Sequence, residues 1–131
     1  MKSQERIKEA LKESEERYRA VMEQSVEAIY LYDVQTKRVL ESNEAFRRMI
    51  GYAEEELIGK RIYDFIDHDK EDIDANIRRS LQERRRHIGE RRYRRKDGTV
   101  ILVDTSASVI SYDGESAVCA LSRDVSRTPS A

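Results

Sequence analysis

The chain has 131 residues, of which 39% are charged and 38% hydrophobic, and its 25 basic and 26 acidic side chains give a net charge of -1. This length suits one compact domain with an appendage rather than two full domains. There is no uncharged apolar run of about 18 residues and no apolar segment after the first lysine, so we expect neither a membrane span nor a signal peptide. The single cysteine, Cys119, excludes an internal disulfide and is typical of a protein in the reducing cytoplasm.

The first 22 residues carry the pattern of an amphipathic helix. Residues that can form one seam recur at intervals of four and three, at Ile7, Leu11, Ser14, Tyr18 and Val21. This is the spacing of a coiled coil. About three heptads are marginal for a helix standing alone, so the helix is expected to pack on its own domain, on the same helix of a second chain, or on both.

Two strands, three short helical segments and a long helix are predicted next, in the order strands 26–32 and 38–41, helical segments 44–50, 54–58 and 62–66, and long helix 69–86. The first strand is rich in β-branched and aromatic residues. Ser42 or Asn43 is a good N-cap for the helix that follows, and Gly51 ends that helix. Ile73, Ile77 and Leu81 share one face of the long helix.

The last third of the chain changes to the period of β-strands. Strands are predicted at 88–95, 99–112 and 115–125, separated by Asp97-Gly98 and Asp113-Gly114. Asp-Gly between two β runs is a strong signal for a hairpin turn. The order of elements therefore predicts an α+β fold, with helices on one face of an antiparallel sheet.

Residue patterns that would carry catalysis are missing. None of the five glycines forms a phosphate-binding loop, and His68 and His87 do not share a helix face at metal-ligand spacing. The carboxylates lie in charge-rich stretches, where a pKa shifted for acid–base chemistry is not expected. Cys119 lies in an apolar strand and is expected to be a small buried hydrophobe. We expect no enzymatic activity and no metal site.

The stretch Arg84–Lys96 is strongly basic and could contact phosphate backbones. The run holds one aromatic residue, Tyr93, and the chain is not basic overall, so an exposed strand edge is the favoured interpretation. Contact with nucleic acid is a distant alternative. We expect no nucleic-acid partner and no membrane contact from this segment.

Six short motifs follow one another along the chain: Glu15-Glu16-Arg17-Tyr18, Asn43-Glu44-Ala45-Phe46, Gly51 to Lys60, Phe65 to Asp69, Arg94 to Gly98, and Arg123-Asp124-Val125-Ser126. Together they resemble the PAS domain family, the sensory-box modules of signalling proteins. The resemblance implies a five-stranded antiparallel sheet with helices over one face, as a domain at 23–126. Residues 1–22 would then be an N-terminal helix, and residues 127–131 a linker or chain end.

The resemblance also implies a signal-transduction input module of a larger protein, commonly a sensor histidine kinase of a two-component system, a cyclic-dinucleotide enzyme or a transcription regulator. The chain holds no phosphoacceptor histidine box and no ATP-binding motif, so the output domain is expected in the parent chain. Two functions stay open: a sensor that binds a small ligand, and a ligand-free module for dimerisation and signal relay.

Each cofactor-binding branch of the family holds its cofactor through characteristic residues, which differ from the residues of this chain. The blue-light flavin branch carries an Asn-Cys pair where this chain has Arg61-Ile62. The haem-binding oxygen sensors carry a histidine in the long helix, near Ile73, where this chain has none. We therefore expect neither a flavin adduct nor haem, and the branch with a cysteine-linked chromophore also lacks its cysteine here. A small-molecule ligand, or a filled core without one, remains.

A ligand would lie between the sheet and the long helix, lined by Phe46, Met49, Ile73, Ile77, Val103, Thr105, Ala107, Ala120 and Ser122. Normal core packing of the same residues is the competing interpretation. Arg92 joins this set if it points inward, where it would need an acidic partner; if Tyr93 points inward instead, the pocket is more apolar. A period of two cannot decide, because a slip of one residue exchanges the faces.

Residues at both ends of the domain are expected to relay the signal. Ile7, Leu11, Tyr18 and Val21 would form the seam of a homodimer. The resemblance implies that Asp124 with Ser126 ties the sheet to the segment that follows it. The relay would change the register or angle of the flanking helices.

Overall fold

The structure, a computed structural model, describes residues 16–125. Residues 16–24 are helical, and the elements that follow are β1 (Ala28–Asp33), β2 (Val39–Ser42), α2 (Glu44–Ile50), α3 (Glu54–Leu57), the 3-10 helix η1 (Ile62–Asp64), α4 (Lys70–Glu83), β3 (Arg85–Arg94), β4 (Val100–Tyr112) and β5 (Glu115–Asp124). The predicted order of elements is confirmed. Ile7, Leu11, Ser14 and Ser126 lie outside the described residues.

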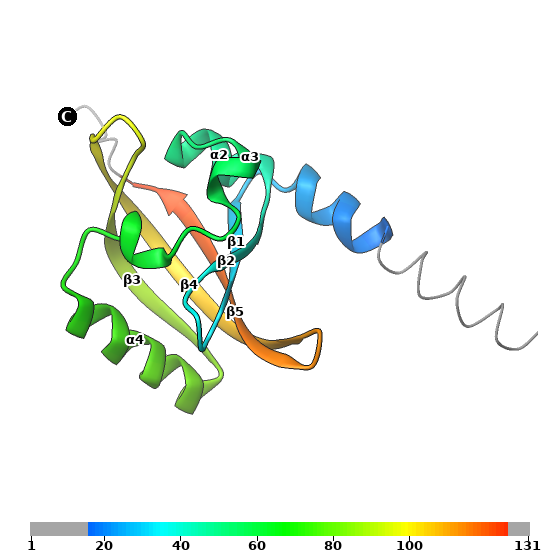
Figure 1. The fold of residues 1–131 in the computed structure, drawn as a ribbon, viewed down its shortest axis with the longest axis vertical. Helices are drawn as coiled ribbons and strands as arrows, with labels where there is room; N and C mark the ends of the chain where they lie inside the picture. Colours follow the sequence, from blue (N-terminus) through cyan, green and yellow to red (C-terminus); the bar gives the residue numbers. More distant parts are fainter. Residues whose placement is uncertain (1–15, 126–131) are drawn as a thin grey trace, which may run out of the picture.

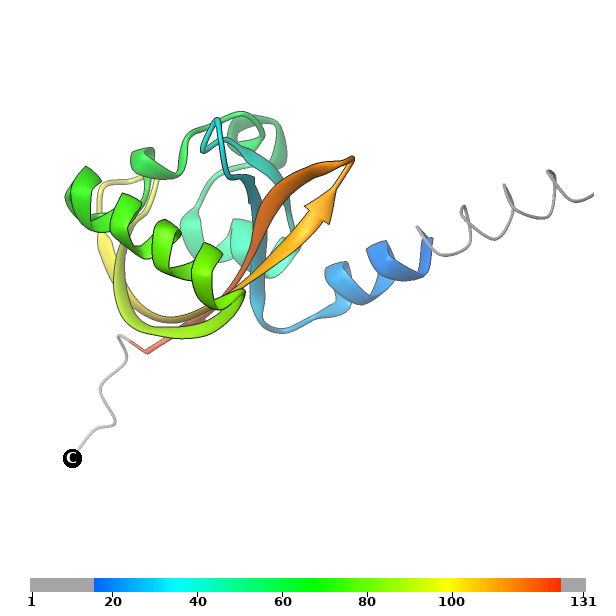
Figure 2. The ribbon, with the colours of Figure 1, turned by 90° about the horizontal axis from the view of Figure 1, so that it is seen from below.

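The five strands form one antiparallel sheet in the order β2-β1-β5-β4-β3. At the β4–β5 turn, Asp113 and Gly114 have φ values of 50° and 81°. Two positive φ angles match the right-handed twist of the strands, which is why Asp-Gly joins them. Figure 1 and Figure 2 show the helices from α2 to α4 on one side of the sheet, and the N-terminal helix projecting away from that body. The predicted α+β fold is confirmed.

Helix α2 has the bounds predicted for it, because both of its ends are capped as the sequence indicates. The side chain of Asn43 accepts a hydrogen bond from the Phe46 backbone N–H, and Gly51 ends the helix in the left-handed conformation with φ 84°. Glycine adopts this conformation without the clash that a Cβ atom would cause.

Helix α4 ends three residues earlier than predicted. Arg84 adopts a left-handed φ of 69° at the end of the helix, and Arg85 already pairs with Ser108 of β4. The Val109 N–H donates to the Arg84 carbonyl at 2.8 Å. Pairing with β4 supplies the hydrogen bonds that a longer helix would have made, so tertiary contacts override the helical pattern of the arginine run.

The core lies between the helices and the inner face of the sheet. Four aromatic rings form its centre, and each is at most 1% exposed: Tyr30, Phe46, Phe65 and Tyr93. Tyr30 of β1 stacks on Phe46 of α2 with ring centroids 4.4 Å apart, and meets Phe65 edge-to-face at 5.3 Å. Such pairs add specific geometry to the burial of apolar area, so α2 is held tightly against β1.

Candidate functional site

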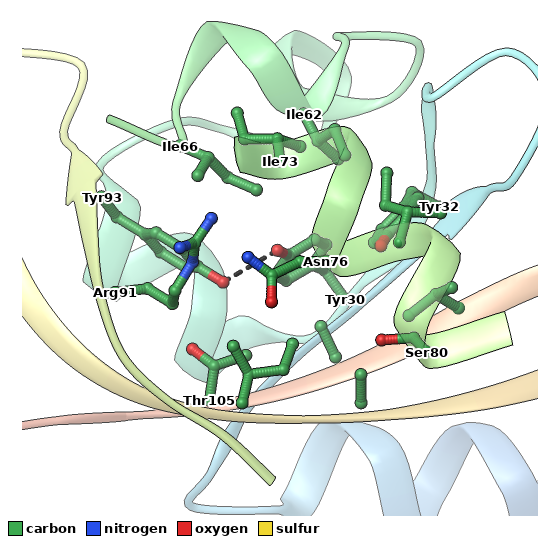
Figure 3. A pocket seen from close by; sticks show the side chains of 15 residues that line it. Tyr30, Tyr32, Ile62, Ile66, Ile73, Asn76, Ser80, Arg91, Tyr93 and Thr105 are labelled. Atoms are coloured by element: carbon green, nitrogen blue, oxygen red, sulfur yellow. Dashed lines mark hydrogen bonds between the residues drawn. The ribbon is translucent and has the colours of Figure 1, made fainter. Parts of the chain in front are cut away.

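A cavity lies between α4 and the inner face of the sheet, and Figure 3 shows the 15 side chains that line it. The space open to the centres of water molecules is about 30 Å³, which is room for about two waters. The wall is formed by Tyr30, Tyr32, Ile62, Ile66, Ile73, Asn76, Ile77, Ser80, Ile88, Arg91, Tyr93, Thr105, Ala107, Val118 and Ala120.

The structure brings part of the predicted pocket set together at this cavity: Ile73, Ile77, Thr105, Ala107 and Ala120. The others lie elsewhere. Phe46, Val103 and Ser122 are buried in the core but are not part of the cavity wall, and Met49 is half-buried against the core.

Arg92 points away from the cavity, and Tyr93 points inward. The Arg92 side chain is 51% exposed and lies 3.6 Å from the Asp67 carboxylate, whereas Tyr93 is 1% exposed. Assigning Arg92 to the pocket is therefore corrected. The parity of β3 depends on a bulge between His87 and Gly89, and a strict period of two does not carry across a bulge.

Sequence reasoning missed Arg91, the arginine that does line the cavity. Its side chain is 10% exposed, and its Nη1 donates to Asp72 Oδ1 at 3.0 Å. Arg91 lies two residues before Tyr93, so both share one face of β3. The apolar ring of Tyr93 was the signal that could have placed Arg91 inward.

A chain of four buried hydroxyl groups joins three residues of the cavity wall, Tyr30, Tyr93 and Thr105, through Ser122 of the core. Tyr30 and Tyr93 are joined oxygen to oxygen at 2.8 Å, Ser122 donates to Tyr93 at 3.3 Å, and Thr105 meets Ser122 at 3.3 Å. Burial raises the pKa of Tyr30 well above its ordinary value, so the phenol keeps its proton at neutral pH. Hydrogen bonding of this kind offsets the cost of burying polar groups.

Charged side chains surround Arg91 at the edge of the cavity. Asp72, on the first turn of α4, accepts from Arg91 and also from Asn76 Nδ2 at 2.8 Å. His68 accepts the Arg92 backbone N–H at 3.0 Å, and its Nδ1 lies 3.7 Å from Asp72. Burial, followed by the charges of Arg91 and Arg92, lowers the pKa of His68. The imidazole is therefore neutral at pH 7, as its acceptor role requires.

Asn43 connects the core to the N-terminal helix. Its amide nitrogen donates to the Met22 carbonyl at 2.9 Å and to the Glu27 carbonyl at 2.8 Å, and its oxygen accepts from the backbone of Ile29 and Phe46. The side chain is fully buried. A continuous path of contacts therefore runs from Tyr30 through Phe46 and Asn43 to the end of the helix.

Two of the predicted relay residues lie on this helix with much of their surface exposed. Tyr18 is 45% exposed and Val21 is 71% exposed. Partial burial, with the nearby charge of Glu41, raises the pKa of Tyr18 to about 12. At the other end, Asp124 is the last residue of β5 and pairs with Val103 in register.

The described residues contain neither a metal-binding cluster nor a membrane-spanning helix. Between residues 16 and 125, no group of three or more His, Cys, Asp or Glu side chains could hold a metal ion. Within the same range, no helix combines the length and the apolar character needed to cross a bilayer.

Comparison with known proteins gives one family. A family model for the PAS domain matches residues 26–127. The PAS domain of an HTR-like protein from Haloarcula marismortui is 30% identical, with a TM-score of 0.78, over 92% of this chain and 99% of that one. The PAS domain of a two-component sensor histidine kinase is 22% identical with a TM-score of 0.72, over 86% and 97% of the two chains, and this likeness shows the fold alone.

A curated relative is much longer than this chain. The methyl sulfide methyltransferase-associated sensor of Methanosarcina acetivorans is 27% identical over 121 residues. The match covers 89% of this chain and 12% of that protein. The family match over most of the chain agrees with the five-stranded sheet, the helices on one face and the cavity beneath α4, and this chain belongs to the PAS domain family of sensory modules.

Proposed function

We propose that this PAS domain is the ligand-sensing input module of a larger cytoplasmic signalling protein, with a sensor histidine kinase or a similar regulator as output. The chain corresponds to 12% of a relative that is named a sensor. A neighbour in fold is titled as part of a two-component sensor histidine kinase. Both names support an input role, and we propose that catalysis lies in the parent chain.

The observation that carries the proposal is the polar lining of the cavity. Tyr30, Tyr93, Thr105 and Arg91 place hydroxyl and guanidinium groups around a space inside a largely apolar core. Burying such groups costs free energy that apolar side chains would not cost. A core that only needed to pack would not require them, whereas a binding site uses them to orient a ligand.

The size of the cavity limits the class of ligand. Room for about two waters suits a ligand of a few heavy atoms, and a flavin or haem group would need the core to be rebuilt. Arg61 and Ile62, at the positions of the flavin branch's Asn-Cys pair, support the same limit.

The relay would run through Asn43. A ligand beside Tyr30 would shift the tyrosine ring, which stacks on Phe46. The Phe46 backbone N–H donates to the side chain of Asn43, the N-cap residue of α2, and the Asn43 amide donates to the Met22 carbonyl. Arg47 adds an ion pair with Glu23 at 3.2 Å. Movement of α2 by a fraction of an ångström would therefore change the angle of the N-terminal helix, which is the expected output towards the rest of the protein.

The second candidate is a ligand-free module for homodimerisation and signal relay. The small volume of the cavity favours it, because a core without a ligand is nearly filled. The exposed Tyr18 and Val21 favour it as well, since a second helix of the same kind would cover them.

Nucleic-acid binding through the basic run receives no support from the geometry. Arg91 pairs with Asp72, Arg94 with Asp67 and Lys96 with Glu56, at 2.5–3.0 Å. These cations already have acidic partners within the domain, so they are less available to phosphates than the sequence alone indicates.

Native mass spectrometry of the purified chain, under gentle and then denaturing conditions, separates the two candidates. A small bound mass that leaves on denaturation is the result expected for a sensor. A dimer with no added mass favours the relay module. A monomer with no added mass under every condition contradicts both.

A further inference from the structure

We infer that the cavity is built for a small monocarboxylate, held by Arg91. The inference rests on the proposed function, because it names the class of ligand for the same cavity. It starts from the charges of the wall. Of the described residues that line the cavity, none is Asp or Glu, and Arg91 is the one that carries a full charge. The wall therefore carries one positive charge, whose acidic partner Asp72 lies outside the wall, and a buried cation favours an anion beside it.

The guanidinium of Arg91 has more donors than partners. Arginine carries five N–H groups, and one hydrogen bond, from Nη1 to Asp72, links this guanidinium to the described residues. In the described part of the chain, the one buried side-chain polar atom without a partner is Arg95 Nε. The unpaired nitrogens of Arg91 therefore border space that water can enter. Arg91, Tyr30 and Tyr93 are all among the side chains that line this space in Figure 3.

The hydroxyl chain also ends in a donor. Four hydroxyl groups hold four protons, and the three hydrogen bonds between them use three. Because Ser122 donates to Tyr93, Thr105 must donate to Ser122, and the unused proton belongs to Tyr30 or Tyr93. Both tyrosines line the cavity. A tyrosine O–H and the N–H groups of Arg91 therefore offer donors to one space.

A carboxylate fits these donors in both shape and charge. A planar guanidinium binds the two oxygens of a carboxylate with a matching fork, and the small volume of the cavity restricts the ligand to a few heavy atoms. Much of the remaining wall is apolar, including Ile66, Ile73, Ile77 and Ile88, and its other polar side chains, among them Asn76 and Ser80, are uncharged. A short alkyl group has contacts there, whereas a second charge has none. This favours a monocarboxylate with a short chain.

Asp72 is the competitor that the ligand must displace. Its side chain is 43% exposed and already accepts from Asn76. It can therefore turn towards solvent when an anion takes its place on Arg91. Removing its charge should strengthen binding of an anion, a result that a misfolded variant cannot mimic.

The test is a calorimetric titration of the full chain with sodium acetate at constant ionic strength, with acetamide as the neutral ligand of the same shape. Acetate is expected to bind and acetamide to bind at least about tenfold more weakly, as a charged hydrogen bond implies. Arg91→Gln should lower the affinity for acetate by about tenfold or more. Asp72→Asn should raise that affinity several-fold. Arg92→Gln, a matched change on the outer face of the same strand, should leave it unchanged.

Each alternative result is decisive. Equal binding of acetate and acetamide, unaffected by Arg91→Gln, overturns the carboxylate inference and leaves a sensor for a neutral ligand. Weaker acetate binding in Asp72→Asn overturns the competition between Asp72 and the ligand, and with it the inference. If acetate does not bind while native mass spectrometry recovers another small molecule, the inference fails and the proposed function stands. If neither finds a ligand, both fail.

Discussion

Asn43 both stabilises the domain and connects its core to the N-terminal helix, so its replacement by alanine is the most informative single change. The buried amide makes four hydrogen bonds, to the backbone of Met22, Glu27, Ile29 and Phe46. Loss of the N-cap bond costs about 1 kcal/mol of stability. Loss of each of the other three bonds leaves a backbone group without its partner and costs about 1 kcal/mol more. Asn43→Ala should therefore lower the free energy of unfolding by about 4 kcal/mol, a large part of the 5–15 kcal/mol typical of a domain.

Urea denaturation followed by far-ultraviolet circular dichroism measures this change. The matched control is Asn76→Ala, because Asn76 is a helical amide with partly exposed hydrogen bonds to Asp72 and Arg86, and its loss should cost about 1 kcal/mol or less. Asn43→Ser should fall between the two, since a serine oxygen can still cap α2. If Asn43→Ala costs no more than Asn76→Ala, the view of Asn43 as the connection between helix and core is wrong.

Three further predictions follow from the described contacts. Tyr30→Phe and Tyr93→Phe should each lower the free energy of unfolding by about 1 kcal/mol. Because the two hydroxyls share one hydrogen bond, the loss measured by urea unfolding of the double variant should be smaller than the sum of the two single losses. Strict additivity would mean that the bond contributes nothing. Burial and two neighbouring arginines lower the pKa of His68 below 6.5, so the unfolded state binds a proton first and the free energy of unfolding should fall as the pH drops below about 6.5. That slope should be shallower in His68→Gln, and urea midpoints from about pH 8 to about pH 5 test it. Val21→Glu should weaken any self-association seen by sedimentation without changing the thermal midpoint, since Val21 is 71% exposed; an unchanged dimer would exclude this helix face from the interface.

The elements of the fold were predictable where local chemistry decides them. Asn43 and Gly51 fix both ends of α2, and Asp113-Gly114 fixes the β4–β5 turn. The end of α4 was not predictable, because Arg84 and Arg85 have good helix propensity and only pairing with β4 draws them out of the helix.

The site was predictable from the fold in outline and not in detail. Ile73, Ile77 and Ala107, which were expected in the pocket, lie in the cavity wall because their elements face each other across the layer. The choice among consecutive arginines depended on the bulge at His87–Gly89, which has no clear sequence signature beyond one glycine. The hydroxyl chain joins Tyr30 to Ser122 across three strands, and such long-range polar contacts leave no periodic pattern in a sequence.

The central claim is that a small ligand in the cavity moves the N-terminal helix. An amide NMR titration of the full chain with acetate tests it most directly, with Thr105 reporting on the cavity and Met22 on the helix. The account predicts that both amides shift along one binding curve with the same midpoint, and that Asn43→Ser reduces the shift at Met22 more than that at Thr105. A shift at Thr105 with Met22 unchanged at saturation would contradict the relay, and no shift at either would contradict the sensory role of the cavity towards acetate.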